Sequence, residues 1–154
     1  MTCLVDASHT SNKVAYRSHN GIFIFLKNVP VVWYSKKQNT VESSTFGSEF
    51  VALRLAKGLR YKLRIFGVSI DGTTSVMCDN QSVMKNATVP TSMLSKKHNS
   101  ICYHKVRESV ASRWINNAWI KSSLNIADLF TKVLPMVTRN GLVDRMMVRW
   151  PPKK

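Results

Sequence analysis

The sequence predicts an α/β domain in which a five-stranded mixed sheet is flanked by helices. Two features of the chain predict this class. Three strand-like segments come first, and helical and strand-like segments then follow one another to the end. Of the 154 residues, 44% are hydrophobic, which is enough for a substantial core. A meander of strands followed by helix–strand units indicates a sheet with both antiparallel and parallel pairs.

The first three elements are expected to be strands. Residues 2–5 form a short apolar run, and a polar loop is expected over residues 8–20. Residues 21–26 and 31–36 are rich in β-branched and aromatic side chains, and the turn between them contains Asn and Pro, so a hairpin is expected. Trp33 and Tyr34 alternate on the third strand. Trp33 is expected to face the core, with a surface stacking platform as the alternative.

Residues 43–66 change to helical spacing. Glu49 precedes Ala52 and Leu53 by three and four residues, so it lies on the same apolar face. A charge on such a face is costly unless it is paired or binds a metal. Gly67 is expected to end the helix. The apolar positions of this face are Ala52, Leu53, Ala56, Leu59, Leu63 and Phe66.

The second half of the chain alternates strands with helices. A strand is expected at residues 73–78, a short helix capped by Asn80 at 81–87, and a longer helix at about 95–113. A fifth strand at 114–120 and a helix at about 125–134, which Pro135 ends, complete a domain over residues 1–135. The C-terminal tail, residues 136–154, has room for one short helix.

Charge is strongly unbalanced in this chain. The 23 Lys and Arg oppose 8 Asp and Glu, which gives a formal net charge of +15. Such a balance favours a partner with a phosphate backbone, with an acidic protein or a membrane surface as the alternative.

Three widely spaced cysteines indicate neither a disulfide framework nor a zinc knuckle and favour an intracellular location. Neither a secretory signal nor a membrane span is indicated.

Four of the acidic residues lie where a structural role is hard to justify. Asp6 and Asp79 each follow an apolar strand-like run, Glu49 lies on a core face, and Asp128 opens the last predicted helix. Carboxylates gathered in this way indicate a divalent metal site, because Mg²⁺ prefers hard oxygen ligands. In a basic protein, such a site suggests a nucleic-acid substrate.

Each carboxylate also has a structural alternative. Asp6 suits a strand-end turn, and Glu49 suits a buried ion pair with a lysine. Asp79 suits a helix cap, a role that Asn80 also fills. Asp128 stands at capping-box spacing, and the helix dipole favours an acid in a first turn.

Several segments of the chain carry more specific patterns. Residues 32–38 read VWYSKKQ, residues 41–52 read VESSTFGSEFVA, and residues 78–82 read CDNQS. Residues 97–108 contain Lys-His followed by His-x-x-Arg-Glu, and residues 126–135 read IADLFTKVLP. In this order and spacing, the segments resemble the ribonuclease H domain of copia-type retrotransposon polyproteins. The resemblance extends from about Leu4 to Pro135.

This resemblance implies a ribonuclease H-like fold, whose element order the chain shares. It implies that Asp6, Glu49, Asp79 and Asp128 are the catalytic residues and the ligands of two Mg²⁺ ions, with Mn²⁺ as a substitute. The implied activity is hydrolysis of the RNA strand of RNA–DNA hybrids during reverse transcription, without a small-molecule cofactor. The implied partners are the hybrid and the reverse transcriptase part of the parent polyprotein, in a cytoplasmic virus-like particle or the nucleus.

Polar and basic residues near these acids are candidate nucleic-acid contacts. Asn80, Gln81 and Ser82 carry groups that suit a 2′-hydroxyl and a minor groove, with helix capping as the alternative. Lys36 and Lys37 are candidate phosphate contacts, which would hold a hybrid without reading its sequence. Solvated charges at a strand end are the alternative for both lysines.

Two other functions stay open at the level of the sequence. One is a catalytically inactive, basic nucleic-acid-binding remnant of such a polyprotein. The other is an integrase or transposase core, which has a related fold but an acid order of Asp, Asp, Glu, whereas glutamate is second here. His98 and His104 are six residues apart and do not share a helix face, so a zinc pair is not indicated. Neither clearly takes the role of the mobile-loop histidine of related nucleases, and His104 is expected to form a surface pair with Glu108.

Overall fold

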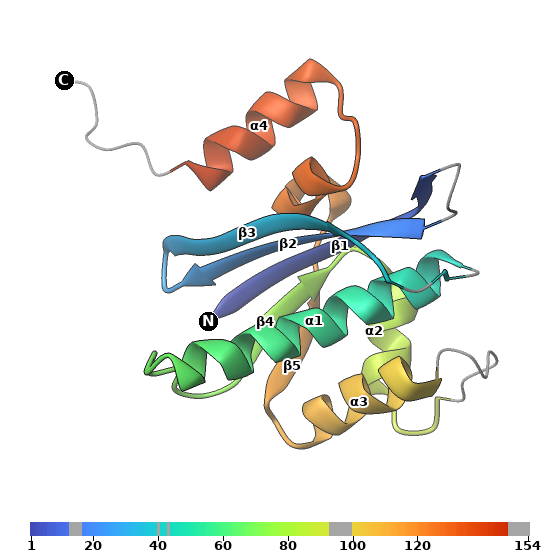
Figure 1. Ribbon diagram of the computed structural model, residues 1–154, viewed down its shortest axis with the longest axis vertical. Helices are drawn as coiled ribbons and strands as arrows, with labels where there is room; N and C mark the ends of the chain where they lie inside the picture. Colours follow the sequence, from blue (N-terminus) through green and yellow to red (C-terminus); the bar gives the residue numbers. More distant parts are fainter. Residues whose placement is uncertain (13–16, 40, 43, 93–99, 148–154) are drawn as a thin grey trace.

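A mixed sheet with helices on both faces confirms the predicted fold class (Figure 1). The computed structural model describes residues 1–12, 17–39, 41–42, 44–92 and 100–147. The five strands follow the order β3-β2-β1-β4-β5 across the sheet. They are β1 (Thr2–Asn12), β2 (Arg17–Leu26), β3 (Val29–Lys37), β4 (Thr74–Cys78) and β5 (Ile115–Trp119).

Strand direction divides the sheet into two halves. β1 pairs with β2, and β2 with β3, in antiparallel fashion, and a tight turn at Lys27 and Asn28 joins β2 to β3. Lys27 takes the left-handed conformation that such a turn needs, with φ at 56°. β1 and β4 are parallel, as are β4 and β5, since helices carry the chain back between them.

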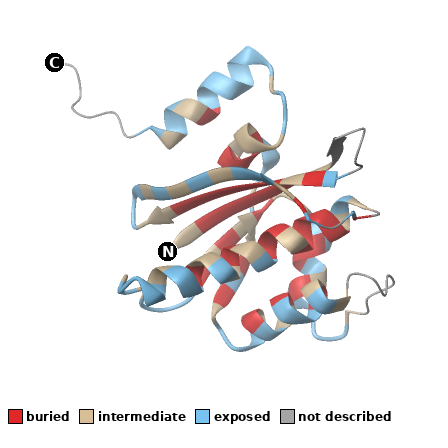
Figure 2. Cartoon of the chain, in the orientation of Figure 1, coloured by how far each residue is buried: buried red, intermediate tan, exposed pale blue. Residues whose placement is uncertain are grey.

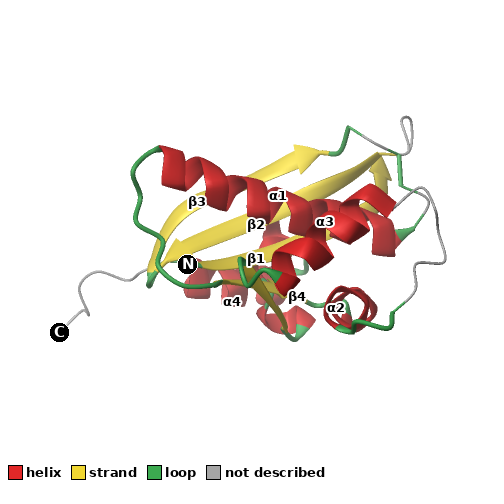
Figure 3. Cartoon of the chain, turned by 90° about the horizontal axis from the view of Figure 1, so that it is seen from below, coloured by secondary structure: helices red, strands yellow, loops and turns green. Residues whose placement is uncertain are grey.

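The helices form two layers (Figures 1 and 3). α1 (Thr45–Ile65), α2 (Gln81–Thr88) and α3 (Ser100–Ala111) cover one face of the sheet and enclose the larger core with it. The short 3-10 helices η2 (Ser122–Leu124) and η3 (Ile126–Phe130), followed by α4 (Met136–Met146), are on the opposite side. The smaller core packs Leu4 and Phe23 of the sheet against Ile126 and Ala127 of η3.

Alternation along β1 assigns each side chain to one of these layers. Cys3, Val5 and Ala7 belong to the core beneath α1, whereas Leu4 belongs to the core beneath η3. Asp6 has the same parity as Leu4, so its carboxylate is on the η3 side of the sheet.

Two strands extend further than their apolar residues indicate. The expected polar loop over residues 8–20 is wrong at both ends, because β1 continues to Asn12 and β2 begins at Arg17. Backbone pairing needs no apolar side chain, and it continues through Ser8 opposite His19. Asp6 therefore lies within a strand, opposite Gly21, and not at a strand end.

The helix predicted at 125–134 is also wrong in kind. The 3-10 helix η3 occupies the first half of this region, and the chain leaves helical geometry after Phe130. Asn125 accepts a hydrogen bond from the Ala127 N–H and donates its own amide to the Val5 carbonyl, 3.1 Å away. This contact with β1 ties the start of η3 to the sheet, so the segment follows the sheet and not its own helical preference.

α4 supplies the short helix for which the tail had room. Figure 2 shows it largely exposed, and Leu142 is its one buried residue. The division of the chain at residue 135 stays a prediction. The expected start of α3 near residue 95, together with His98, lies outside the described residues.

The prediction that Trp33 faces the core is wrong. Trp33 is 56% exposed and stacks on Phe23 with ring centroids 6.3 Å apart, whereas Tyr34 packs against the larger core.

Within the described ranges, no helix combines the length and apolarity that crossing a membrane requires.

Candidate metal centre

Four carboxylates from four different elements converge at one end of the sheet. They belong to Asp6 in β1, Glu49 in α1, Asp79 directly after β4, and Asp128 in η3. Oxygens of Asp6, Asp79 and Asp128 lie within 4.8 Å of one another, and Glu49, Asp79 and the Cys78 sulfur form a second such group. The structure thus brings together all four acids singled out in the sequence, and Asp79 belongs to both groups.

Strand register explains why Asp6 and Asp79 are neighbours. In the parallel pair, Leu4 of β1 stands opposite Met77 of β4. Asp6 and Asp79 are each two residues further along the chain, so they lie at the same level of the sheet. The Trp119 indole N–H of β5 donates to the Asp79 carbonyl at 3.0 Å, which fixes the backbone just beyond β4.

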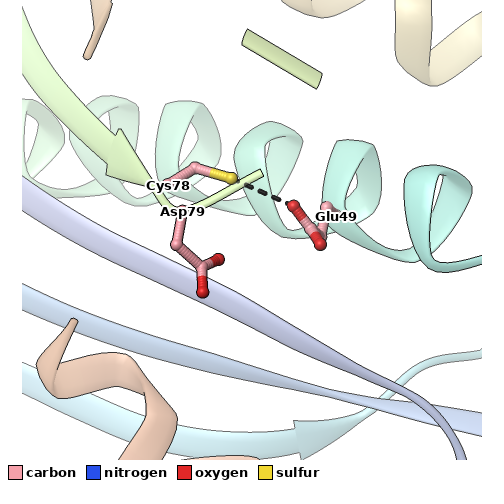
Figure 4. Close-up of side chains that lie close together, drawn as sticks. All are labelled: Glu49, Cys78 and Asp79. Carbon is pink, nitrogen blue, oxygen red and sulfur yellow. Dashed lines mark hydrogen bonds between the residues drawn. The ribbon is translucent and has the colours of Figure 1, made fainter. Parts of the chain in front are cut away.

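Glu49 is held from two sides. Its Oε2 accepts from the Cys78 thiol at 3.0 Å, and its Oε1 accepts from the Asn80 amide at 3.1 Å. Figure 4 shows the Cys78 sulfur pointing at Glu49, with the Asp79 carboxylate directed away from the sulfur. Burial raises the pKa of the Cys78 thiol, which therefore acts as a neutral donor.

The pKa of Glu49 is raised to about 7, because burial penalises its charge. The hydrogen bonds from Cys78 and Asn80 oppose this shift, while repulsion from Asp79 and Asp6 adds to it. Only 4% of Glu49 is exposed, so few waters solvate the charge. A nearby cation would therefore stabilise the charged form of this buried carboxylate.

Lys132 is a site residue that the sequence prediction did not include. Its ammonium Nζ lies 3.2 Å from Asp6 Oδ1 and 3.1 Å from Asp128 Oδ1. The Thr131 hydroxyl donates to the second oxygen of Asp6, Oδ2. The spacing of four residues between Asp128 and Lys132 was a usable signal, since in the helix predicted at residues 125–134 it would place both side chains on one face.

Burial also raises the pKa of Asp128, to about 6. The Asp6 carboxylate adds to this increase, and Lys132 opposes it. The net shift is upward, so the attraction of Lys132 does not outweigh burial and the repulsion from Asp6.

Gly21 allows η3 to lie directly over the strand that pairs with Asp6. A Cβ atom at this position would be 2.5 Å from the Ala127 carbonyl oxygen and 2.8 Å from the Thr131 Cγ2. A larger residue would therefore push away the segment that carries Asp128.

A cleft of about 580 Å³ is lined by three of the four acids, Asp6, Glu49 and Asp79. Gln81 and Ser82, at the start of α2, also line it and are exposed. Asn80 is engaged within the protein, because its Oδ1 accepts from the N–H groups of Ser82 and Val83 while its amide donates to Glu49. Asn80 therefore fills the capping role that the sequence left open, and Asp79 does not need to.

Lys36 and Lys37 line a different groove. This groove, of about 540 Å³, also includes Arg54 and Lys62 of α1. Lys36 stands opposite Asn20, which stands opposite Ala7, so the lysines are two strands from the carboxylates. That separation is about 10 Å.

The donor set fits a divalent cation. It consists mainly of carboxylate oxygens, which suit Mg²⁺, Mn²⁺ and Ca²⁺. Burial raises the pKa of both Glu49 and Asp128, and repulsion from neighbouring carboxylates adds to each shift, so a bound cation would stabilise their charged forms. His104 is exposed on α3, with its ring edge-on to Tyr103, and belongs to another surface hollow.

Strand order and helix placement together define a ribonuclease H-like fold, and solved structures agree. The chain superposes on a ribonuclease H1 from the halophilic archaeon Halobacterium salinarum with a TM-score of 0.62 and 14% identity, covering 93% of this chain and 96% of that one. LC11-RNase H1, solved in complex with an RNA/DNA hybrid, gives a TM-score of 0.65 and 16% identity, covering 84% and 92%. A foamy viral protease-reverse transcriptase, also solved with a hybrid, gives 0.58 and 16%, covering 84% and 19%.

Sequence comparison indicates what kind of protein contains such a segment. The chain is 26% identical, over 152 residues, to the retrovirus-related Pol polyprotein from transposon RE1 of Arabidopsis thaliana. It is 25% identical to the corresponding polyprotein from transposon RE2. Each alignment covers 96% of this chain, which spans about 10% of the polyprotein. No protein-family model matches the chain.

Together these comparisons confirm the resemblance to the ribonuclease H region of a retrotransposon polyprotein. Assignment to the copia type stays a prediction, as do the roles of individual site residues.

Proposed function

We propose that this chain is the ribonuclease H domain of a copia-type retrotransposon polyprotein, and that it cuts the RNA strand of RNA–DNA hybrids in a metal-dependent reaction. The observation that carries this proposal is the convergence of four carboxylates from separate elements, Asp6, Glu49, Asp79 and Asp128, in two groups that share Asp79. Such a carboxylate set, in a chain of net charge +15, suits hydrolysis of a polyanion.

The four carboxylates would hold the cations, Mg²⁺ in the first instance and Mn²⁺ as a substitute. When bound, two such cations activate the attacking water and stabilise the leaving oxygen of the cleaved phosphodiester. Asp79 lies in both ligand groups, so it would help to hold either cation. Cys78 and Asn80 orient Glu49, and Thr131 orients Asp6, so these residues act as positioning groups.

The substrate would contact the protein beyond the metal ligands. Gln81 and Ser82 stand exposed at the cleft and offer groups able to bind a 2′-hydroxyl, which distinguishes RNA from DNA. Lys36 and Lys37, about 10 Å from the carboxylates, would hold a flanking phosphate backbone. Two of the structural neighbours were solved with RNA/DNA hybrids, which supports the same substrate class here.

Within a polyprotein, the natural partner would be the reverse transcriptase part, which produces the hybrid. We place this activity inside the cell, in a cytoplasmic virus-like particle or the nucleus.

The decisive experiment is cleavage of a hybrid labelled on its RNA strand, with Mg²⁺, by the whole chain. Asp79→Asn keeps the size of the side chain and removes its charge, so it is expected to lower the cleavage rate by about a hundredfold or more. Duplex DNA is the substrate control and should stay intact. Hybrid binding without cleavage would instead identify an inactive nucleic-acid-binding domain.

A further inference from the structure

Lys132 stands where a cation is most needed. Its ammonium contacts Asp6 Oδ1 at 3.2 Å and Asp128 Oδ1 at 3.1 Å, and oxygens of both aspartates lie within 4.8 Å of Asp79. The two carboxylates are 2% and 8% exposed, whereas the lysine side chain is 39% exposed. The ammonium is therefore a point charge inserted from the surface between two buried anions.

We propose that Lys132 is a resident counter-cation, which holds the carboxylates of Asp6 and Asp128 together in the metal-free protein and competes with divalent cations for them. This inference rests on the proposed metal centre. It assigns Lys132 a positioning role that governs how tightly the centre takes up metal.

The hydrogen bonds around Asp6 support this role. Thr131 donates to Oδ2 of Asp6, so the other oxygen, Oδ1, is the one directed at Lys132. The same ammonium contacts Asp128, four residues earlier in the chain. A cation that binds Asp6 Oδ1 and Asp128 Oδ1 together must take the place of this ammonium.

Like charges explain why the protein benefits from the lysine. Three carboxylates with oxygens within 4.8 Å repel one another in a partly desolvated cluster. The Asp128 side chain is only 8% exposed, so few waters screen this repulsion. Without Lys132, the metal-free protein would keep this repulsion without its nearest compensation.

The side chain of Lys132 is also able to move away. It lines the open cleft, and its stem has four rotatable carbons. Displacement into the cleft would leave the ammonium close to the phosphates of a bound nucleic acid. The free energy needed for that displacement would lower the affinity of the site for the metal ion.

The test compares wild-type protein with Lys132→Met, which keeps an unbranched side chain and removes the charge. Thermal unfolding is followed in chelator and in MnCl₂, and Mn²⁺ binding is titrated calorimetrically without nucleic acid. In chelator the variant should melt below wild type. Mn²⁺ should raise its melting temperature by more, and its Mn²⁺ dissociation constant should be tighter by about tenfold, since the lysine is partly screened by solvent.

Two variants serve as controls. Lys132→Arg keeps the charge and should resemble wild type in both buffers. Lys105→Met removes a lysine whose ion pair with Glu108 is exposed on both sides, and it should change neither the melting temperature nor the Mn²⁺ response.

A double variant, Asp128→Asn with Lys132→Met, keeps the inference testable if the single variant does not fold. Removal of one negative charge together with the positive one should restore folding in chelator. Failure of the double variant to recover would show that the lysine acts through packing, and would overturn the inference.

The remaining outcomes separate this inference from the proposed function. Equal stabilisation and equal Mn²⁺ affinity in wild type and Lys132→Met would overturn the role of Lys132 and leave the metal centre standing. Absence of any Mn²⁺ response in both proteins would overturn the metal centre and, with it, this inference.

Discussion

Substitution of Gly21 by alanine should damage the site from a residue that carries no functional group. The added Cβ would lie 2.5 Å from the Ala127 carbonyl oxygen, whereas ordinary contacts begin at 3.4 Å. The backbone of η3 must therefore retreat by about 0.9 Å, the difference between these two distances. Since Asp128 follows Ala127 directly, its carboxylate would move away from Asp6 by a similar amount.

Both stability and activity should respond. Overpacking of this kind costs about 1–3 kcal/mol, to be measured as a lower urea midpoint with an unchanged m-value. A displacement near 1 Å at a catalytic group lowers the rate by about a hundredfold, to be measured by hybrid cleavage under conditions where the variant is fully folded.

Gly141→Ala is the matched control. Gly141 lies within α4 and has no atom within 4 Å of an added Cβ, so alanine there should leave cleavage unchanged and stabilise the helix slightly, by about 0.5–1 kcal/mol. Cleavage by the Gly21→Ala variant at the wild-type rate would refute the reasoning, because it would show that the site does not need the close approach of η3 to β2.

Three further predictions concern charge. Burial raises the pKa of Glu49 from 4.5 to about 7, so in chelator this group contributes stability that is complete below about pH 4.5 and lost as the pH rises through about 7. Glu49→Gln should flatten the fall in unfolding free energy over that range in urea titrations, and an unchanged slope would contradict the assignment. Lys36→Ala and Lys37→Ala should each weaken hybrid binding and lower the slope of log affinity against log salt by about 1, as read by fluorescence anisotropy; equal loss at all salt concentrations would argue against phosphate contacts. Arg60 is buried and donates to the Thr74 hydroxyl and, at 2.8 Å, to the Gly72 carbonyl, so Arg60→Met should cost about 1–3 kcal/mol in urea denaturation, and a loss below about 0.5 kcal/mol would contradict it.

Local periodicity was sufficient for one of the site residues. The apolar face of α1 includes Ala52 and Leu53, and helical geometry alone places Glu49 beside them. Burial of all three residues confirms this prediction. The cap at Asn80 was equally accessible, since amide side chains at the start of a helix have few alternatives.

Long-range pairing could not be derived in this way. Asp6 and Asp79 are neighbours because β1 pairs in parallel with β4, at a register that sets Leu4 opposite Met77. No local pattern in either strand specifies that partner, and only the resemblance of the motifs supplied it. The continuation of β1 beyond its apolar residues escaped prediction for the same reason.

Tertiary contacts overrode local preference near η3. A helical pattern was predicted there, but the hydrogen bond from Asn125 to Val5 and the close approach to Gly21 impose a short 3-10 turn.

Trp33 illustrates a different difficulty. Trp33 and Tyr34 are both aromatic and alternate along an edge strand, so composition does not decide which of them faces the core.

The contacts of Asn125, Thr131 and Lys132 with β1 have a consequence for the order of events during synthesis. They join residues that are 120 to 126 positions apart, whereas the Glu49 and Asn80 side chains meet across 31. A growing chain can therefore bring Glu49 and Asp79 together long before Asp6 meets Asp128. The metal site as a whole would therefore form only after residue 132 has left the ribosome and docked on the first strand, and the proposed nuclease activity would be a late event in the maturation of the chain.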